Sequence, residues 1–185
     1  SDATPILPER VVDALNRLLP DNSVVVADPG TPCPYMSAYL TMKKPGRRYI
    51  TNRAHGALGY ALSASMGAHI GRPDAKTVSI MGDGSFAFTA GEFETVTRRN
   101  MPITFIVFSN SVFGWIKAGQ KSGFGERFFS VDFNRTDHAA VATAYGIKSW
   151  RVEQPGELDA ALAAALAHDG PSLVDVISQP LQDAA

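Results

Sequence analysis

The sequence has little of several features that mark particular classes of protein. Cys33 is the one cysteine in 185 residues, so an intrachain disulfide is excluded and a reducing compartment is indicated. The net charge is −1 and 19% of the residues are charged, which argues against a nucleic-acid-binding surface or attraction to an anionic membrane. No apolar run is long enough to cross a bilayer.

The first residues also lack the apolar core of a signal peptide, because Pro5, Pro8, Glu9 and Arg10 interrupt them. These absences predict a cytoplasmic protein, or a piece of one, with no nucleic-acid partner and no membrane contact. A chain of 185 residues with 45% hydrophobic residues can bury a substantial core. We therefore expect residues 1–185 to form a single domain.

Predicted strands and helices alternate along the chain. The strands are expected at 23–27, 48–51, 77–81, 103–108, 148–152 and 172–177. The helices are expected at 11–19, 56–70, 91–99, 137–145 and 155–168. The central strands are continuous apolar runs, which is typical of a parallel sheet buried on both faces. The predicted fold class is α/β, a doubly wound parallel sheet with helices on both faces.

A carboxylate and a carboxamide follow two of these apolar strands. Asp83 stands between Gly82 and Gly84 after the 77–81 strand, and Asn110 follows the 103–108 strand. Their separation fits one strand–helix–strand crossover, which places both at the carboxyl edge of a parallel sheet. Oxygen ligands suit Mg²⁺, which commonly binds few protein groups together with phosphate oxygens. The pattern indicates a metal–diphosphate anchor.

The residues around Asp83 support the same interpretation. Gly82 and Gly84 are expected to let the backbone turn tightly and approach a ligand. Backbone N–H groups at the start of the next helix, near Ser85, would face diphosphate oxygens. A plain Asp-Gly turn that closes a strand is the commoner outcome for Gly-Asp-Gly alone. The position of Asn110 and a wider resemblance favour the anchor.

Gly82-Asp83-Gly84 with Asn110 resembles the thiamine-diphosphate motif of the acetolactate synthase, benzoylformate decarboxylase and pyruvate oxidase superfamily. The resemblance implies that Asp83 and Asn110 bind Mg²⁺ through their side chains and that Val112 binds it through its backbone carbonyl. One departure is Ser109, which replaces the first Asn of the pair that usually ends the motif. In the family the second Asn is the ligand, so the expected chemistry is kept.

A second segment, Gly56-Ala57-Leu58-Gly59-Tyr60-Ala61-Leu62, resembles the family block that lies beneath the cofactor. The resemblance implies that Leu58 enforces the bent cofactor conformation and that the Gly56 carbonyl accepts from its aminopyrimidine. A glycine-rich helix start packed on a strand is the alternative. The implied cofactor-binding residues are Gly56, Leu58, Gly82, Asp83, Gly84, Ser85, Asn110, Val112, Phe113 and Gly114.

Other polar residues carry less information, and the catalytic residues stay undetermined. His55 either faces the substrate and shuttles protons or bonds to the backbone of its own loop. His138 is expected at the surface or as a helix cap. Cys33 has no sequence neighbour that would activate it, so we expect an inert thiol.

In this superfamily the glutamate that activates the aminopyrimidine lies on a separate pyrimidine-binding domain, usually across a dimer interface. Nothing in this chain resembles that domain. The resemblance therefore implies a diphosphate-binding, C-terminal domain with thiamine diphosphate and Mg²⁺ as cofactors, either excised or a small subunit, within a homo-oligomer. The chain alone is expected to be inactive.

The implied function is that of a 2-keto acid decarboxylating carboligase of acetolactate synthase type, a transferase or lyase. Ala118-Gly119 stand where family synthases carry Gln-Trp near the acceptor, so another 2-keto acid decarboxylase or lyase is the alternative. A third hypothesis is a non-catalytic module that kept the fold, and the retained Asp83, Asn110 and Leu58 argue against it. A dinucleotide-binding oxidoreductase lacks support, since no Gly-x-Gly-x-x-Gly follows the first strand.

Overall fold

The computed structural model describes residues 2–180, so residue 1 and residues 181–185 of the predicted domain lie outside the described part. Six parallel strands form one sheet in the order β2-β1-β3-β4-β6-β5. The strands are β1 (Ser23–Ala27), β2 (Tyr49–Ile50), β3 (Lys76–Gly82), β4 (Thr104–Ser109), β5 (Lys148–Val152) and β6 (Ser172–Ile177).

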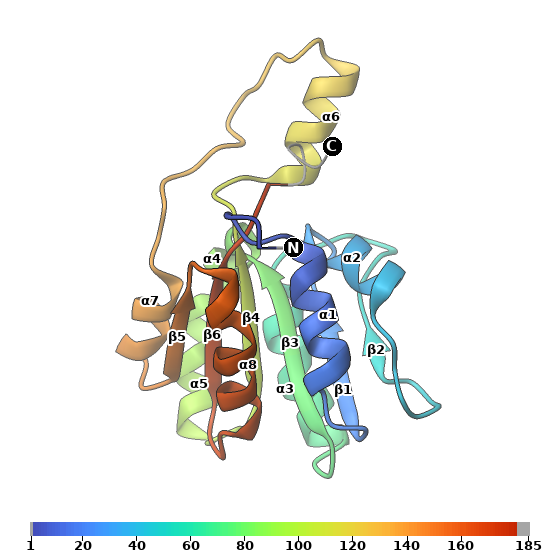
Figure 1. Cartoon of the computed structure of the whole chain (residues 1–185), viewed down its shortest axis with the longest axis vertical. Coiled ribbons are helices and arrows are strands. Elements are labelled where there is room, and N and C mark those ends of the chain that lie inside the picture. The colour runs from blue at the N-terminus through green and yellow to red at the C-terminus, as the bar shows by residue number, and fades with distance from the viewer. Residues whose placement is uncertain (1, 181–185) are drawn as a thin grey trace.

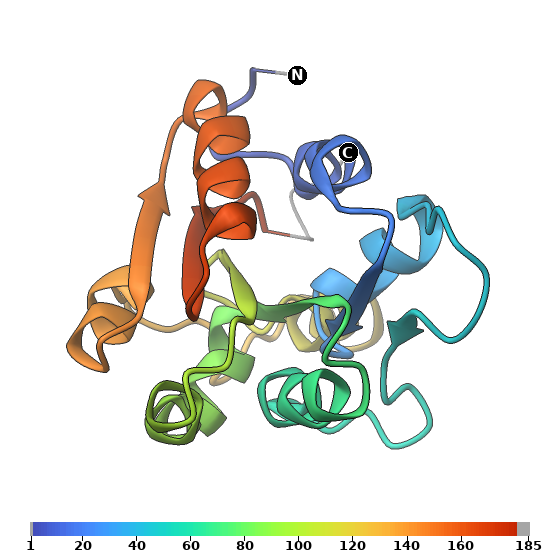
Figure 2. The same cartoon turned by 90° about the horizontal axis from the view of Figure 1, so that it is seen from below.

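Helices cover both faces of this sheet, so the predicted doubly wound α/β fold is confirmed. One face carries α1 (Pro8–Leu18), α2 (Pro32–Tyr39) and α8 (Leu158–Ala167). The other carries α3 (Tyr60–Gly71), α4 (Asp83–Thr89), α5 (Phe93–Arg98) and α7 (His138–Ala144). In Figure 2 the blue α1 and orange-red α8 lie on one side of the sheet, and the green α3 and α5 lie on the other.

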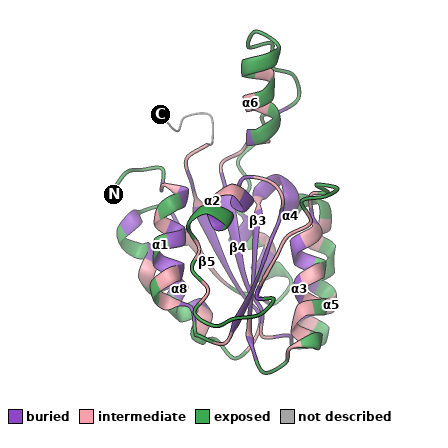
Figure 3. Ribbon diagram, turned by 90° about the vertical axis from the view of Figure 1, so that its right-hand side faces the viewer, coloured by how far each residue is buried: buried purple, intermediate pink, exposed green. Residues whose placement is uncertain are grey.

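The central strands divide the hydrophobic core into two layers. Phe105 and Val107 of β4 pack with α5 and α7, whereas Ile106 and Phe108 pack with α1 and α8. This division follows from the alternation of side chains along a strand. Every residue of β1 and β4 is buried, which explains their continuous apolar sequences, and β4 is purple in Figure 3.

Several elements differ from the sequence prediction, and the expected helices also do not include α4 or the helix at Gly114–Gly123. The helix expected at 56–70 begins at Tyr60, because Gly56 and Gly59 have φ of +72° and +87° and cannot continue a right-handed helix. The helix α2 is not predicted at all, since it begins with Pro32-Cys33-Pro34. Proline is nevertheless tolerated in a first helical turn, where its missing N–H would have no partner.

The connections after β1 and β3 leave on opposite faces of the sheet. The chain passes from β1 to α2, which packs in the α1–α8 layer, and from β3 into α4, which packs in the α5–α7 layer. Adjacent parallel strands whose connections diverge leave a crevice at their carboxyl ends, where open α/β sheets bind ligands. Helix α6 (Gly114–Gly123) projects beyond this edge and is largely exposed (Figures 1 and 3).

Within residues 2–180, none of the helices combines the length and the apolar character that a membrane span requires.

Candidate functional site

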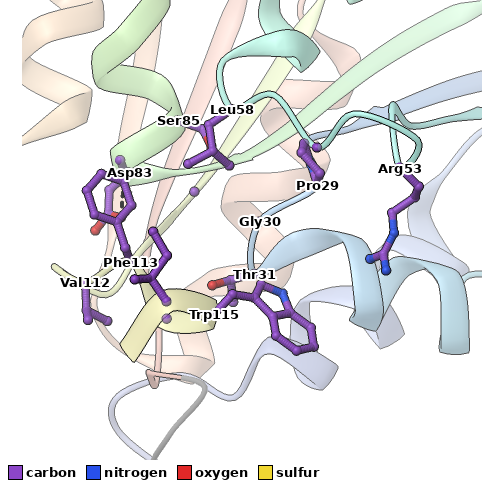
Figure 4. Close-up of a pocket in the computed structure, with 15 residues that line it drawn as sticks. Pro29, Gly30, Thr31, Arg53, Leu58, Asp83, Ser85, Val112, Phe113 and Trp115 are labelled. Carbon is purple, nitrogen blue, oxygen red and sulfur yellow. Dashed lines mark hydrogen bonds between the residues drawn. The ribbon is translucent and has the colours of Figure 1, made fainter. Parts of the chain in front are cut away.

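A cavity of about 360 Å³ opens at the carboxyl edge of the sheet, between the loops that follow β1 and β3. Figure 4 shows Asp83 and Phe113 on one side of it, Arg53 on the other, and Leu58 and Pro29 between them. The sequence-predicted residues that line it are Gly56, Leu58, Gly82, Asp83, Gly84, Ser85, Val112, Phe113 and Gly114. Asn110 lines two neighbouring cavities instead, of about 580 Å³ and about 260 Å³.

Asp83 is buried and held by backbone N–H groups. Its Oδ1 accepts from the Gly84 N–H at 2.8 Å, and its Oδ2 accepts from the N–H groups of Asn110 at 2.8 Å and Ser111 at 2.6 Å. Burial raises the pKa of Asp83, and these three hydrogen bonds oppose that rise. Since a carboxylate has about four acceptor positions, Oδ1 keeps one for a cation.

Asn110 is therefore brought to Asp83 by its backbone, as the strand-end argument predicts. Its side-chain Oδ1 accepts from the Val112 N–H at 3.2 Å, across the left-handed residue Ser111 at φ +57°. An amide oxygen has two lone pairs, so this bond leaves one available.

Val112 lies in a short antiparallel bridge with Asp132. The residues on either side of Val112 make the hydrogen bonds to that strand: the Phe113 N–H donates to Val131 O and Ser111 O accepts from the Phe133 N–H. Backbone groups of successive residues alternate in direction, so the N–H and carbonyl of Val112 face away from Asp132. They face the side on which the Asn110 amide lies.

The two glycines beside Asp83 serve different purposes. A Cβ on Gly84 would collide with the Phe113 ring, so Gly84 allows that ring to close one wall of the cavity. Gly82 has φ −81°, which any residue adopts, and a Cβ there would meet nothing within 4 Å. The chain turns directly from β3 into α4 at this point, but the turn does not require a glycine at position 82, and the space beside Gly82 is open to a bound group.

Leu58 lies on the floor of the cavity, fixed between two loops. A Cβ on Gly30 would come within 3.4 Å of Leu58 Cδ2 and 3.9 Å of Ser85 Oγ, so these three residues converge. Gly59 follows in a left-handed conformation, and a Cβ there would approach Thr89 Cγ2 at 2.9 Å. Close packing thus holds the Leu58 loop against α4.

His55 is exposed in the turn before Gly56 and is not among the described residues that line the cavity. Within residues 2–180 no hydrogen bond ties His55 to its loop, while the Gly56 N–H donates to Asn52 O at 2.9 Å. Neither of the two roles expected for His55 has a contact that supports it.

Asp28, at the end of β1, is a buried acid for which the sequence predicts no role beyond a turn after the first strand. It is fully buried at the start of α3, and burial raises its pKa to about 7 against the lowering effect of the N–H groups of Ala61, Tyr60 and Gly59. Those N–H groups face the carboxylate without reaching hydrogen-bonding geometry, since neither oxygen has a partner among the described residues. Asp28 thus lies between the end of β1 and the backbone at the start of α3.

Cys33 has polar neighbours that favour its thiolate, contrary to the expectation drawn from its sequence neighbours. Burial raises its pKa, but four surrounding polar side chains outweigh burial and leave the pKa below the ordinary value. The contacts to Sγ are Thr51 Oγ1 at 3.6 Å, Arg53 Nη1 at 3.6 Å, Ser37 Oγ at 3.6 Å and Tyr49 hydroxyl at 3.7 Å. Three of these neighbours lie 16 to 20 positions along the chain, beyond any local sequence signal.

His138 is also misplaced by the sequence prediction, because it is buried behind the Asn110 loop. Ser109 Oγ donates to Asp175 Oδ1 and lies 2.8 Å from His138 Nδ1. Asp175 Oδ2 accepts from the His138 N–H and from Arg151 Nη1, both at 3.1 Å. The single Ser109 hydroxyl proton goes to the carboxylate, so His138 Nδ1 carries a proton and donates to Ser109.

Within residues 2–180, no three His, Cys, Asp or Glu side chains come together as a metal site. A carboxylate, an amide and a backbone carbonyl would instead form a sparse oxygen site. Such a site suits Mg²⁺ bound together with phosphate oxygens, because Mg²⁺ takes few ligands from the protein.

Comparison with known proteins identifies the family. The family model described as "Thiamine pyrophosphate enzyme, C-terminal TPP binding domain" matches residues 28–176. A probable acetolactate synthase large subunit of Methanococcus aeolicus is 31% identical over 185 residues, covering 97% of this chain and 31% of that protein. Acetolactate synthase of Bacillus subtilis is 33% identical over 169 residues, covering 91% of this chain and 29% of that protein.

A relative with another name also matches. A probable sulfoacetaldehyde acetyltransferase of Rhizobium meliloti is 31% identical over 161 residues, covering 86% of this chain and 27% of that protein. The chain therefore spans less than a third of the length of these curated relatives. It belongs to the thiamine pyrophosphate enzyme family, as a C-terminal TPP-binding domain of the acetolactate synthase-like type.

Proposed function

We propose that this domain binds thiamine diphosphate through one Mg²⁺ and serves a 2-keto acid decarboxylating carboligase of acetolactate synthase type. The observation that supports this most is the state of Asp83. Its carboxylate is 4% exposed, and no basic side chain of residues 2–180 forms an ion pair with it. A buried charge needs a compensating partner, and a cation at the free Oδ1 position would supply one.

The Asp83 and Asn110 side chains and the Val112 carbonyl would be the protein ligands of Mg²⁺. Each of the two side chains keeps an acceptor position, and the Val112 carbonyl faces the same side as Asn110. Diphosphate oxygens would complete the coordination. The open space beside Gly82 has room for them next to the first turn of α4.

The remaining cavity residues would position and enclose the cofactor. Leu58 would support the bent conformation of the cofactor from below, and the Phe113 ring would form another wall of the cavity. Thiamine diphosphate, when bound, supplies the nucleophilic carbon and the electron sink that 2-keto acid decarboxylation needs. The side chains of Trp115 and Ile116 line the mouth at 48% and 52% exposure, so they exclude water only if another surface covers them.

That covering surface would be a pyrimidine-binding domain of the same enzyme. The matched relatives are more than three times as long as the matched region, which leaves room for further domains in them. We infer that the activating carboxylate comes from such a domain, in a homo-oligomer, and that His55 is not needed for cofactor binding.

A decarboxylase or transferase with another acceptor is the second candidate. Residues 118 and 119 of α6 are Ala118 and Gly119, so neither position carries a large side chain. The relatives also carry the names of two different activities. Product analysis with pyruvate as donor would separate these functions, since acetolactate forms only if pyruvate is also the acceptor.

The decisive test is binding of thiamine diphosphate to the chain, measured by calorimetry and by the ³¹P resonances of the diphosphate. We expect binding that requires Mg²⁺ and is at least about tenfold weaker in Asp83→Ala, because a charge-assisted metal contact is lost. Asp13→Asn, at a carboxylate that is 71% exposed, is the matched control and should bind as the wild type does. Equal binding without Mg²⁺, or in Asp83→Ala, would contradict the proposal.

A further inference from the structure

The cavity beside Asp83 carries a positive charge at its opposite end. Among the described residues that line it, Arg53 is the sole basic side chain and Asp83 the sole acidic one. Figure 4 places Arg53 across the cavity from Asp83, with Leu58 and Pro29 between them. A ligand that fills this cavity therefore meets the Asp83 carboxylate, the proposed Mg²⁺ ligand, at one end and the Arg53 guanidinium at the other.

Most of the hydrogen-bonding capacity of Arg53 is free. Its Nη1 contacts Cys33 Sγ at 3.6 Å, and no carboxylate in residues 2–180 forms an ion pair with it. A guanidinium has several further N–H donors arranged as a planar fork, which matches a carboxylate through two parallel hydrogen bonds. Arg53 is exposed at the rim of the cavity, so a ligand can reach these donors.

Cys33 determines where the guanidinium lies. The thiol is fully buried and is also contacted by Thr51, Ser37 and Tyr49, so the sulfur is a fixed acceptor. A long side chain tethered through one Nη loses less conformational entropy when it binds a ligand. Arg53 is thus partly organised for an anion before any ligand arrives.

We propose that Arg53 binds the carboxylate of the second substrate, a 2-keto acid acceptor. This carboxylate remains in the product. This inference rests on the proposed function. The cofactor's diphosphate would be neutralised at the Asp83 end, away from Arg53. The carboxylate of the first 2-keto acid loses its charge as CO₂ leaves, so an ion pair to it would stabilise the ground state more than the transition state. An acceptor carboxylate keeps its charge throughout, so the same ion pair lasts through the reaction.

The test compares two acceptors that differ only by this carboxylate, 2-oxobutyrate and propanal, with pyruvate as donor. It uses the holoenzyme assembled with its pyrimidine-binding domain. For Arg53→Gln we expect the ratio of kcat/KM for 2-oxobutyrate to that for propanal to fall about 10–100-fold, since a charge-assisted bidentate contact is lost. Arg53→Lys should recover part of the ratio, because it keeps the charge without the fork.

A binding measurement on the chain itself tests the proposal without turnover. Saturating 2-oxobutyrate, but not propanal, should shift the Arg53 Nε–H resonance, and Cys33→Ala should weaken that binding because the tether is lost. An unchanged acceptor ratio in Arg53→Gln, or an unmoved Arg53 resonance, would overturn the inference.

The cofactor titration separates this inference from the proposed function. Arg53→Gln should retain Mg²⁺-dependent binding of thiamine diphosphate, whereas Asp83→Ala should lose it. If Arg53→Gln loses cofactor binding as Asp83→Ala does, Arg53 belongs to the diphosphate site and the inference is wrong. If the wild-type chain binds no cofactor even with its pyrimidine-binding domain added back, the proposed function fails, and the Arg53 resonance still reports on anion binding.

Discussion

Gly84 and Gly82 flank Asp83, and an added methyl group would have a different effect at each. In Gly84→Ala the new Cβ collides with the Phe113 ring, so the Asn110–Phe113 loop must shift. We expect a loss of about 1–3 kcal/mol in unfolding free energy, as for other overpacked sites. Gly82→Ala has open space and an ordinary φ, so its stability should match the wild type while its methyl group narrows the cavity.

Urea unfolding together with cofactor titration distinguishes these two variants. Gly84→Ala should lower both stability and cofactor affinity, whereas Gly82→Ala should lower affinity alone. A fully stable Gly84→Ala would show that the Phe113 ring is not fixed where the structure has it.

Asp28 makes stability depend on pH in a predictable direction. Its pKa is raised from 3.8 to about 7 in the folded chain, so the folded state binds the extra proton between these values. Stability from this group is therefore greatest in acid and falls as pH rises from about 4 to about 7. Between pH 5 and pH 8 the wild type should lose about 2–3 kcal/mol relative to Asp28→Asn, which cannot ionise. Urea unfolding at both pH values measures this difference, and parallel pH profiles of the two proteins would contradict the assignment.

At the scale of elements, the buried network of Ser109, His138 and Asp175 ties β4, α7 and β6 together behind the Asn110 loop. Ser109→Ala removes the hydroxyl that donates to Asp175 and accepts from His138. We expect a loss of about 1.5–3 kcal/mol, the usual range for hydrogen bonds to charged groups. Ser122→Ala, at an exposed serine on α6, should change stability by less than about 0.5 kcal/mol. Thermal unfolding of both variants tests this, and equal midpoints would show that the network adds nothing to stability.

Helix α6 is the element that packs least against the rest of the chain. It projects from the sheet edge in Figure 1, and the segment that returns from it exposes Phe124, Phe128 and Phe129, the last at 82%. Aromatic side chains exposed together mark a surface that another surface covers. This agrees with a domain that completes its site only in a larger assembly.

At the scale of the whole molecule, the chain would supply one side of the proposed cofactor site. We expect no steady pyruvate consumption by the chain alone with Mg²⁺ and thiamine diphosphate, because no second domain activates the aminopyrimidine. Adding the pyrimidine-binding domain of the same enzyme should restore CO₂ release, which a coupled assay can follow. Turnover by the chain alone would show that the activating group lies within these 185 residues.

The sequence by itself determined the fold class and the strand ends that carry the site. Strands buried on both faces are largely apolar along their length, so β1, β3 and β4 can be recognised in the sequence as apolar segments. Parallel crossovers then bring Asp83 and Asn110 to one edge of the sheet. The family resemblance predicted which cofactor is bound, because the motifs Gly82-Asp83-Gly84 and Gly56–Leu62 can be recognised without any three-dimensional information.

Only the tertiary structure decided which side chains meet. The four contacts to Cys33, the burial of His138 and the position of Arg53 across from Asp83 all join residues from different elements. The sequence does not encode these pairings as a local pattern, because distances across a packed interior depend on how the layers fit together. The physical reason is the same for the buried charge of Asp28, whose pKa depends on neighbours more than 30 positions away along the chain.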